Sequence, residues 1–149
     1  MQQTKKSVYA FIGSFIFLSV VFCQTGCSSA PPPIPYSSTR TLSKTSPTLL
    51  AIEEQIVQEK SKQDKIENQL LDVESRISQN SKDEKLVKEK QRLEKENELS
   101  QAELALLIGK HQLEAARILK KNDINAREKE IAKLNEKVVE KRKALAEVK

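Results

Sequence analysis

Hydrophobic residues recur at alternating steps of three and four along the C-terminal part of the chain. A first series begins at Leu49, and its apolar members are Leu49, Ile52, Ile56, Ile66, Leu70, Val73 and Ile77. Polar Glu59 and Gln63 interrupt it. A second series continues to the C-terminus as Ile124, Arg127, Ile131, Leu134, Val138, Lys141, Leu145 and Val148. Heptad spacing of this kind predicts helices that pack along a seam.

The stretch between the two seams has a different pattern. Leu104 to Ile108 are five consecutive apolar residues, which at about 100° per residue cover most of a helix circumference. One neighbouring helix cannot cover that surface, so we expect packing against two helices, in one chain or in an oligomer. Docking of residues 104–119 on another protein or on a membrane surface is the alternative. His111, in this stretch, is expected to be a seam or surface residue.

Polar residues mark where the helices are expected to start and stop. Ser46-Pro47 is a favourable N-cap followed by proline at the first helical position. Ser81 and Glu84 have capping-box spacing, so a break is expected near residue 80. A second break is expected near residue 122, in Lys120-Lys121-Asn122-Asp123. The region 47–149 then forms either one rod of ~150 Å at 1.5 Å per residue or a folded hairpin or bundle, which the turn residues favour.

Composition supports an all-α chain of long coiled-coil helices rather than a thick-cored globular domain. Charged residues make up 32% of the sequence, Trp is absent, and Tyr36 is the only aromatic residue after Phe22. The net charge is +5, from 26 basic and 21 acidic side chains that are spread evenly. The sequence has no basic stripe, so nucleic-acid binding is not predicted. The sequence contains no cluster of catalytic residues, so neither an enzyme nor a cofactor is predicted. Two cysteines with a distant His111 do not make a metal site.

The N-terminal residues 1–26 have the organisation of an export signal. Lys5-Lys6 precede Val8 to Phe22, an uncharged and mostly apolar stretch that is short for a transmembrane helix. Gln24-Thr25-Gly26-Cys27 follows and resembles the lipobox of bacterial lipoproteins, although that family usually has an aliphatic residue where this chain has Gln24. The resemblance implies cleavage before Cys27, its acylation and anchoring in a lipid bilayer. A disulfide between Cys23 and Cys27 is the alternative.

Residues 27–46 are rich in serine, threonine and proline. They include Pro31, Pro32, Pro33 and Pro35. Such a composition has little to bury and predicts a disordered, flexible tether between the lipid and the helices. In polyproline II conformation, at ~3.1 Å per residue, it would reach up to ~60 Å.

These features predict an envelope lipoprotein whose coil acts as a structural tether or an assembly module, as a homo-oligomer or with an envelope partner. The plan resembles that of murein lipoprotein, which implies peptidoglycan attachment at Lys149, although this chain ends Glu147-Val148-Lys149 where that family has Tyr-Arg-Lys. Ser28 after the cysteine implies the outer membrane, facing the periplasm. The alternatives are a phage-type inner-membrane spanin, which keeps its apolar segment, and an accessory subunit of a secretion or efflux assembly.

Overall fold

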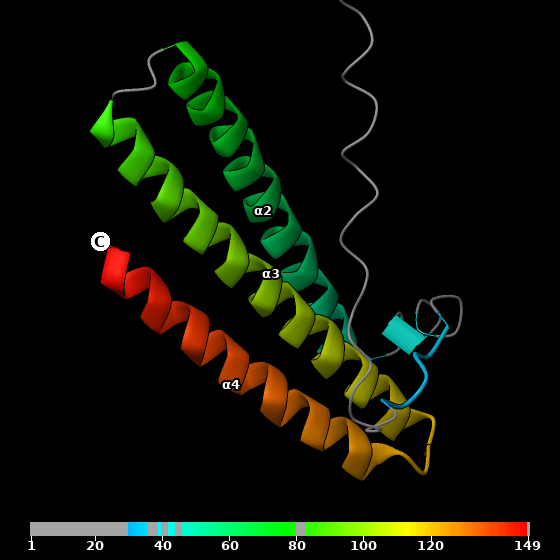
Figure 1. The fold of residues 1–149 in the computed structure, drawn as a ribbon. Coiled ribbons are helices and arrows are strands. Elements are labelled where there is room, and N and C mark those ends of the chain that lie inside the picture. Colours follow the sequence, from blue (N-terminus) through cyan, green and yellow to red (C-terminus); the bar gives the residue numbers. More distant parts are fainter. Residues whose placement is uncertain (1–29, 36–38, 40–41, 44–45, 80–82, 149) are drawn as a thin grey trace, which may run out of the picture.

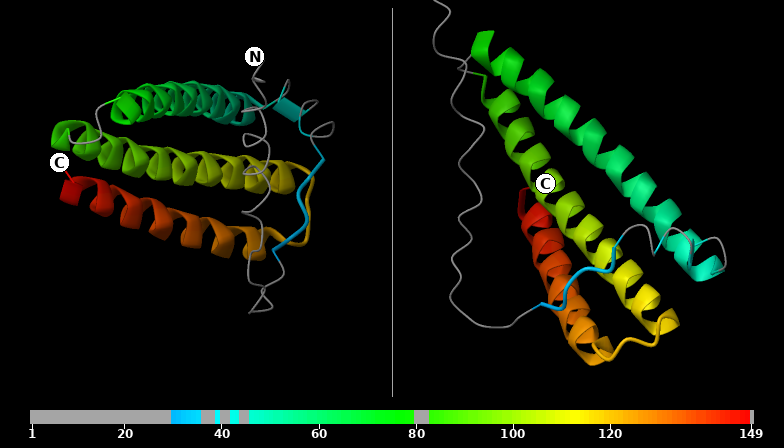
Figure 2. Two further views of the ribbon diagram at one scale, coloured as in Figure 1. Left: turned by 45° about the horizontal axis from the view of Figure 1, so that its top comes forward. Right: turned by 90° about the vertical axis from the view of Figure 1, so that its right-hand side faces the viewer.

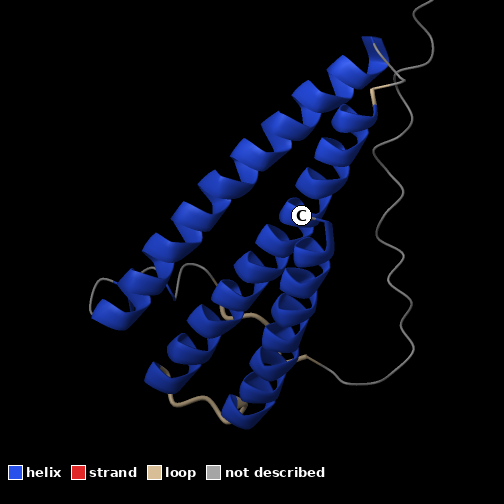
Figure 3. Ribbon diagram, turned by 90° about the vertical axis from the view of Figure 1, so that its left-hand side faces the viewer, coloured by secondary structure: helices blue, strands red, loops and turns tan. Residues whose placement is uncertain are grey.

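The computed structural model describes residues 30–35, 39, 42–43, 46–79 and 83–148. Three long helices make up most of this part: α2 (Pro47–Gln79), α3 (Glu84–Ile118) and α4 (Ile124–Val148). Figure 3 shows that every regular element in the described residues is a helix. The prediction of an all-α chain of long helices is therefore confirmed.

The three helices fold back on one another instead of forming one rod. Consecutive helices run antiparallel, and α3 lies between the other two (Figures 1 and 2). The helix contacts are those of α3 with α2 and of α3 with α4, whereas α2 and α4 hardly touch. The bundle is thus an open layer with α3 at its centre.

The heptad seams pack inside this one chain. On α2, Ile66 and Val73 are buried against Leu93 of α3. On α4, Val138 and Leu145 are buried against Leu99, Ala102 and Leu106 of α3. The helix that carries the run Leu104 to Ile108 is therefore covered from two sides by its own chain, as its apolar circumference requires, although Ile108 itself remains 44% exposed.

The starts of α2 and α3 are both capped by a side chain, and only the cap of α2 is the one that the sequence predicts. The Ser46 hydroxyl accepts a hydrogen bond from the Leu49 N–H at 3.3 Å, as an N-cap at that residue requires. The expected capping box of Ser81 and Glu84 is wrong, because α3 begins at Glu84 and its N-cap is Asp83. The Asp83 carboxylate accepts from the N–H of Lys85 at 3.0 Å and so satisfies a free donor of the first turn.

The end of α3 is a Schellman motif. The N–H of Lys120 donates to the carbonyl of Arg117 at 3.1 Å, and the N–H of Lys121 donates to that of Ala116 at 2.9 Å. This geometry places Lys120 in the left-handed region, at φ 51°. Glycine is the usual residue there because a Cβ atom costs about 1 kcal/mol in this conformation.

Candidate functional site

The two residues for which the sequence predicts covalent chemistry lie outside the described part of the chain. Cys27, the predicted acylation site, precedes the first described residue, Ala30, and Lys149 follows the last, Val148. The structure instead shows the surfaces that such an anchor would hold. The most informative is the short segment that follows Cys27 in sequence.

Residues 30–35, which we call the strap, lie across the central helix. In the right-hand view of Figure 2 this blue segment crosses α3 towards α4. The Ile34 N–H donates to Oε1 of Gln112 at 2.7 Å, and Nε2 of Gln112 donates back to the Ile34 carbonyl at 3.4 Å. One amide side chain of α3 therefore satisfies both backbone groups of Ile34.

Arg127 of α4 holds the strap at a second point. Its Nη2 atom donates to the Pro32 carbonyl at 2.8 Å and to Oδ2 of Asp123 at 2.7 Å. The hydrogen bond from Arg127 lowers the pKa of the Asp123 carboxyl below its usual value. Arg127 is only 5% exposed, so the guanidinium is fixed beneath the strap.

The Ile34 side chain is the apolar part of the attachment. It is buried, and it packs with Leu49 at the start of α2 and with Ala115 and Ala116 near the end of α3. Ile124, at the start of α4, packs against the same cluster. The strap therefore joins the ends of all three helices through one side chain.

The tether expected for residues 27–46 is therefore not free over the strap. The strap sequence Ala-Pro-Pro-Pro-Ile-Pro has few side chains to bury. Its backbone nevertheless binds Gln112 and Arg127, which are 78 and 95 residues away in sequence. The sequence pattern contains two signals for the contact between the strap and the helices. Arg127 occupies an apolar seam position of α4, and Ile34 is a branched apolar residue among prolines.

His111 lies in the same region of the bundle and faces α2. Its ring is buried, and Nε2 lies 3.2 Å from Oε1 of Glu53. The Ser43 hydroxyl donates to the same Glu53 carboxylate oxygen. Of the two expected places for His111, seam or surface, the structure shows the buried seam. Its partner is a carboxylate that also binds Ser43, in the segment before α2.

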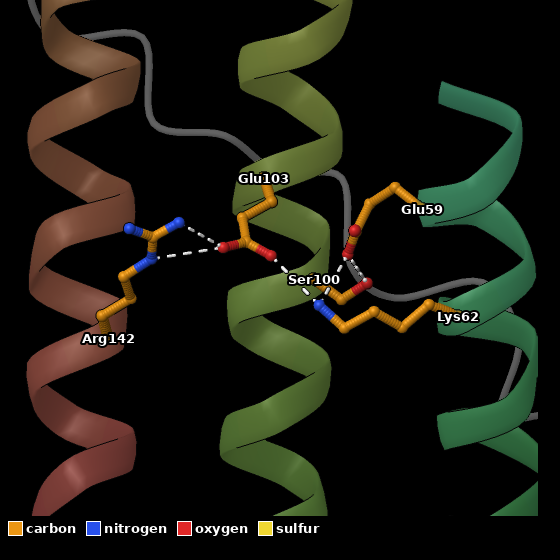
Figure 4. A network of polar contacts seen from close by, with 5 residues as sticks. All are labelled: Glu59, Lys62, Ser100, Glu103 and Arg142. Carbon is orange, nitrogen blue, oxygen red and sulfur yellow. Dashed lines mark hydrogen bonds and ion pairs between the residues drawn. The ribbon is translucent and has the colours of Figure 1, made fainter. Parts of the chain in front are cut away.

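A polar network connects the three helices near their middle (Figure 4). Glu103 of α3 accepts from Lys62 of α2 at 3.1 Å through Oε2, and from Arg142 of α4 at 2.8 Å through Oε1. Glu59 accepts from the Ser100 hydroxyl at 2.6 Å and from Lys62 at 3.1 Å. The polar residue Glu59 in the α2 seam is thus matched by a serine and a lysine.

Two opposing effects set the pKa values in this network. Burial disfavours the charged forms of Glu103 and Lys62, but their hydrogen bonds outweigh it. The pKa of the Glu103 carboxyl lies below its usual value because Arg142 and Lys62 stabilise the carboxylate. The pKa of Lys62 lies above its usual value because Glu103 and Glu59 stabilise the ammonium group. Both groups are held in their charged forms at neutral pH.

The network borders a shallow groove of about 380 Å³ between α2 and α4. Its floor includes Leu106 and Val138, and Val139 on its edge is 59% exposed. Within the described residues, His, Cys, Asp and Glu nowhere gather in threes or more as metal ligands would. None of the described helices combines the length and apolar character needed to cross a membrane.

Comparisons with protein-family models, with curated proteins and with solved structures find no match for this chain. The features of the chain that bear on its function are the predicted anchor at Cys27, the strap and the three-helix layer.

Proposed function

We propose that this chain is a bacterial envelope lipoprotein that holds its helical bundle at a membrane as a structural tether or assembly module. The observation that carries the proposal is Thr25-Gly26-Cys27, placed directly after a basic and then apolar segment. Small residues before the cysteine suit cleavage there, and acyl chains on the new N-terminus give durable anchoring. Ser28 after the cysteine favours the outer membrane, facing the periplasm.

The bundle supports a binding role because it leaves specific surfaces free. The heptad seams are occupied within the chain, so a partner would have to use other side chains. Leu50, Val57 and Leu71 lie on one line of α2 at multiples of seven residues and are 50%, 66% and 65% exposed. Exposed apolar side chains at heptad spacing suit a partner helix, from an envelope protein or a second copy of this chain.

The first test is the intact mass of the protein extracted from membranes. Wild type is compared with Cys27→Ser, and Cys23→Ser is the matched control because it removes the other cysteine. The proposal expects a species that begins at Cys27 and carries acyl mass, present in wild type and Cys23→Ser and absent in Cys27→Ser. An unprocessed chain without acyl mass would contradict it. That result would favour the alternative of a signal-anchored, spanin-type coil that keeps residues 8–22.

Covalent attachment to peptidoglycan through Lys149 is a separate part of the proposal. It is tested by digesting purified peptidoglycan and measuring the bound share of the protein. Deletion of Lys149 should abolish that share, whereas Lys143→Arg, a control on the same helix, should leave it unchanged. A bound share that survives the deletion would exclude Lys149 as the attachment point.

Other membrane assemblies remain to be separated from a free-standing tether. An accessory subunit of a secretion or efflux machine would co-purify with a channel after mild cross-linking in the membrane. The substitution Val57→Glu on the exposed line of α2 should then remove the partner. The matched substitution Lys129→Glu, on exposed α4 surface, should not.

A further inference from the structure

The chain between the predicted anchor and the strap is very short. Only Ser28 and Ser29 separate Cys27 from Ala30. Consecutive Cα atoms lie at most ~3.8 Å apart, so the three steps from Cys27 to Ala30 span no more than about 11 Å. An anchor at Cys27 therefore cannot move far from wherever Ala30 is held.

Ala30 belongs to a segment that is fixed on the flank of the bundle. The strap is held by Gln112 of α3 and by the buried Arg127 of α4, and Ile34 is enclosed by the ends of the three helices. The polar contacts join the strap to α3 and α4, and the Ile34 side chain also packs on Leu49 at the start of α2. A force applied at Cys27 would therefore reach all three helices through the strap.

The surface around the first strap residues is mainly apolar. Ala30 and Pro31 border a hollow of about 420 Å³ on α3 and α4 that Ala105 and Leu134 also line. Ile108, in the same hollow, is 44% exposed. Apolar side chains on a surface that faces a bilayer can enter its interfacial zone, whereas they gain nothing from facing bulk water.

We infer that the strap fastens the acylated Cys27 to the flank of the bundle, so that the side of α3 and α4 beside Ala30 lies at the bilayer surface. This inference rests on the proposed lipid anchor. A docked strap and a free tether allow different distances between the lipid and the bundle. A free chain over residues 27–46 would let the bundle stand up to ~60 Å from the lipid, but the docked strap allows about 11 Å.

Two insertions of the same length distinguish these pictures without disturbing the helices. Eight Gly/Ser residues are placed either between Ser29 and Ala30, before the strap, or between Pro35 and Tyr36, after it. Eight flexible residues have a root-mean-square span of about 16 Å. If the strap carries the anchor, only the insertion before the strap lengthens the connection between the lipid and the bundle.

The distance is measured by energy transfer from a fluorophore on the bundle to a lipid dye. Acylated protein is placed in vesicles of phosphatidylethanolamine and phosphatidylglycerol. Lys133→Cys, on exposed α4 surface, takes the fluorophore, because acylation blocks the thiol of Cys27 and Cys23 leaves with the signal segment. Intact mass confirms acylation before each measurement. Failure to find any acylated species would contradict the proposed function, and with it the anchor on which the inference rests.

In acylated protein, the inference expects a shift of about 10–16 Å for the insertion before the strap and less than about 5 Å for the insertion after it. Adding Ile34→Asp, which should undock the strap, should make the second insertion as effective as the first. Circular dichroism checks that the helices survive this substitution. In protein that keeps Ile34, equal shifts from both insertions would refute the docked strap and leave the lipid anchor intact. So would no shift from either, because the bundle would then bind the bilayer by itself.

Discussion

Glu103 gives the sharpest test of how the open helix layer is held together. Its carboxylate is the one group in the described residues that accepts from both outer helices, through Lys62 and Arg142. Glu103→Gln keeps the size of the side chain and removes its charge. The side chains of Lys62 and Arg142 are 44% and 63% exposed, so solvent screens both pairs. Each pair should contribute about 0.5 kcal/mol, and the substitution should cost about 1 kcal/mol in total.

The cost stays small because no cation is left buried and unpaired. Lys62 keeps its second partner, Glu59, at 3.1 Å, and Arg142 turns to water. The free energy of unfolding is measured with urea at neutral pH, beside Glu136→Gln, the same chemical change at an exposed position of α4. In 1 M salt, where the screening length falls to about 3 Å, most of the difference should disappear.

A double-mutant cycle completes the experiment. Glu103→Gln and Arg142→Gln should show a coupling free energy of about 0.5 kcal/mol. A loss above about 3 kcal/mol, insensitive to salt, would refute the reasoning, because it would mean that the network is desolvated. A loss of unfolding free energy no larger than that of Glu136→Gln at low salt would also refute the reasoning, because it would mean that the two ion pairs contribute nothing.

Three further predictions follow from packing, backbone geometry and charge. Leu93→Ala, at a position 1% exposed, should lower the free energy of unfolding by about 2–4 kcal/mol, whereas Val57→Ala, at 66% exposed, should change it by less than about 0.5 in the same urea titration. Lys120→Gly should stabilise the protein by about 0.5–1 kcal/mol by relieving the positive φ, and a destabilised variant would show that the lysine side chain outweighs the strain. Glu98 and Glu103, whose pKa values are lowered, contribute stability that is complete above pH 4.5 and is lost as the pH falls through their pKa values in the folded protein. Lys62, whose pKa is raised, contributes stability that is lost only above pH 10.5. Thermal unfolding against pH should therefore show an acid limb, which Glu103→Gln makes shallower.

Local sequence was enough to predict the helices, because the signals for a helix lie within a few residues of one another. The heptad steps from Leu49 identify the buried side of α2, and Ser46-Pro47 marks its start. The consecutive apolar residues from Leu104 predicted two neighbours for the central helix. The spacing to Glu84 predicts Ser81 as the cap of α3, but the cap is Asp83. Both residues have capping side chains, and only the position of the first helical turn distinguishes them.

The prediction of an anchor likewise rests on sequence alone, because the lipobox that Thr25-Gly26-Cys27 resembles is a linear motif. Only the tertiary structure decided that the three helices share their seams within one chain and that the proline segment is held on their flank. Whether Ile34 meets Gln112, and Pro32 meets Arg127, depends on where α3 and α4 place those side chains after folding. Composition cannot report this, because it measures how much a segment can bury and not what lies beside it once the chain has folded.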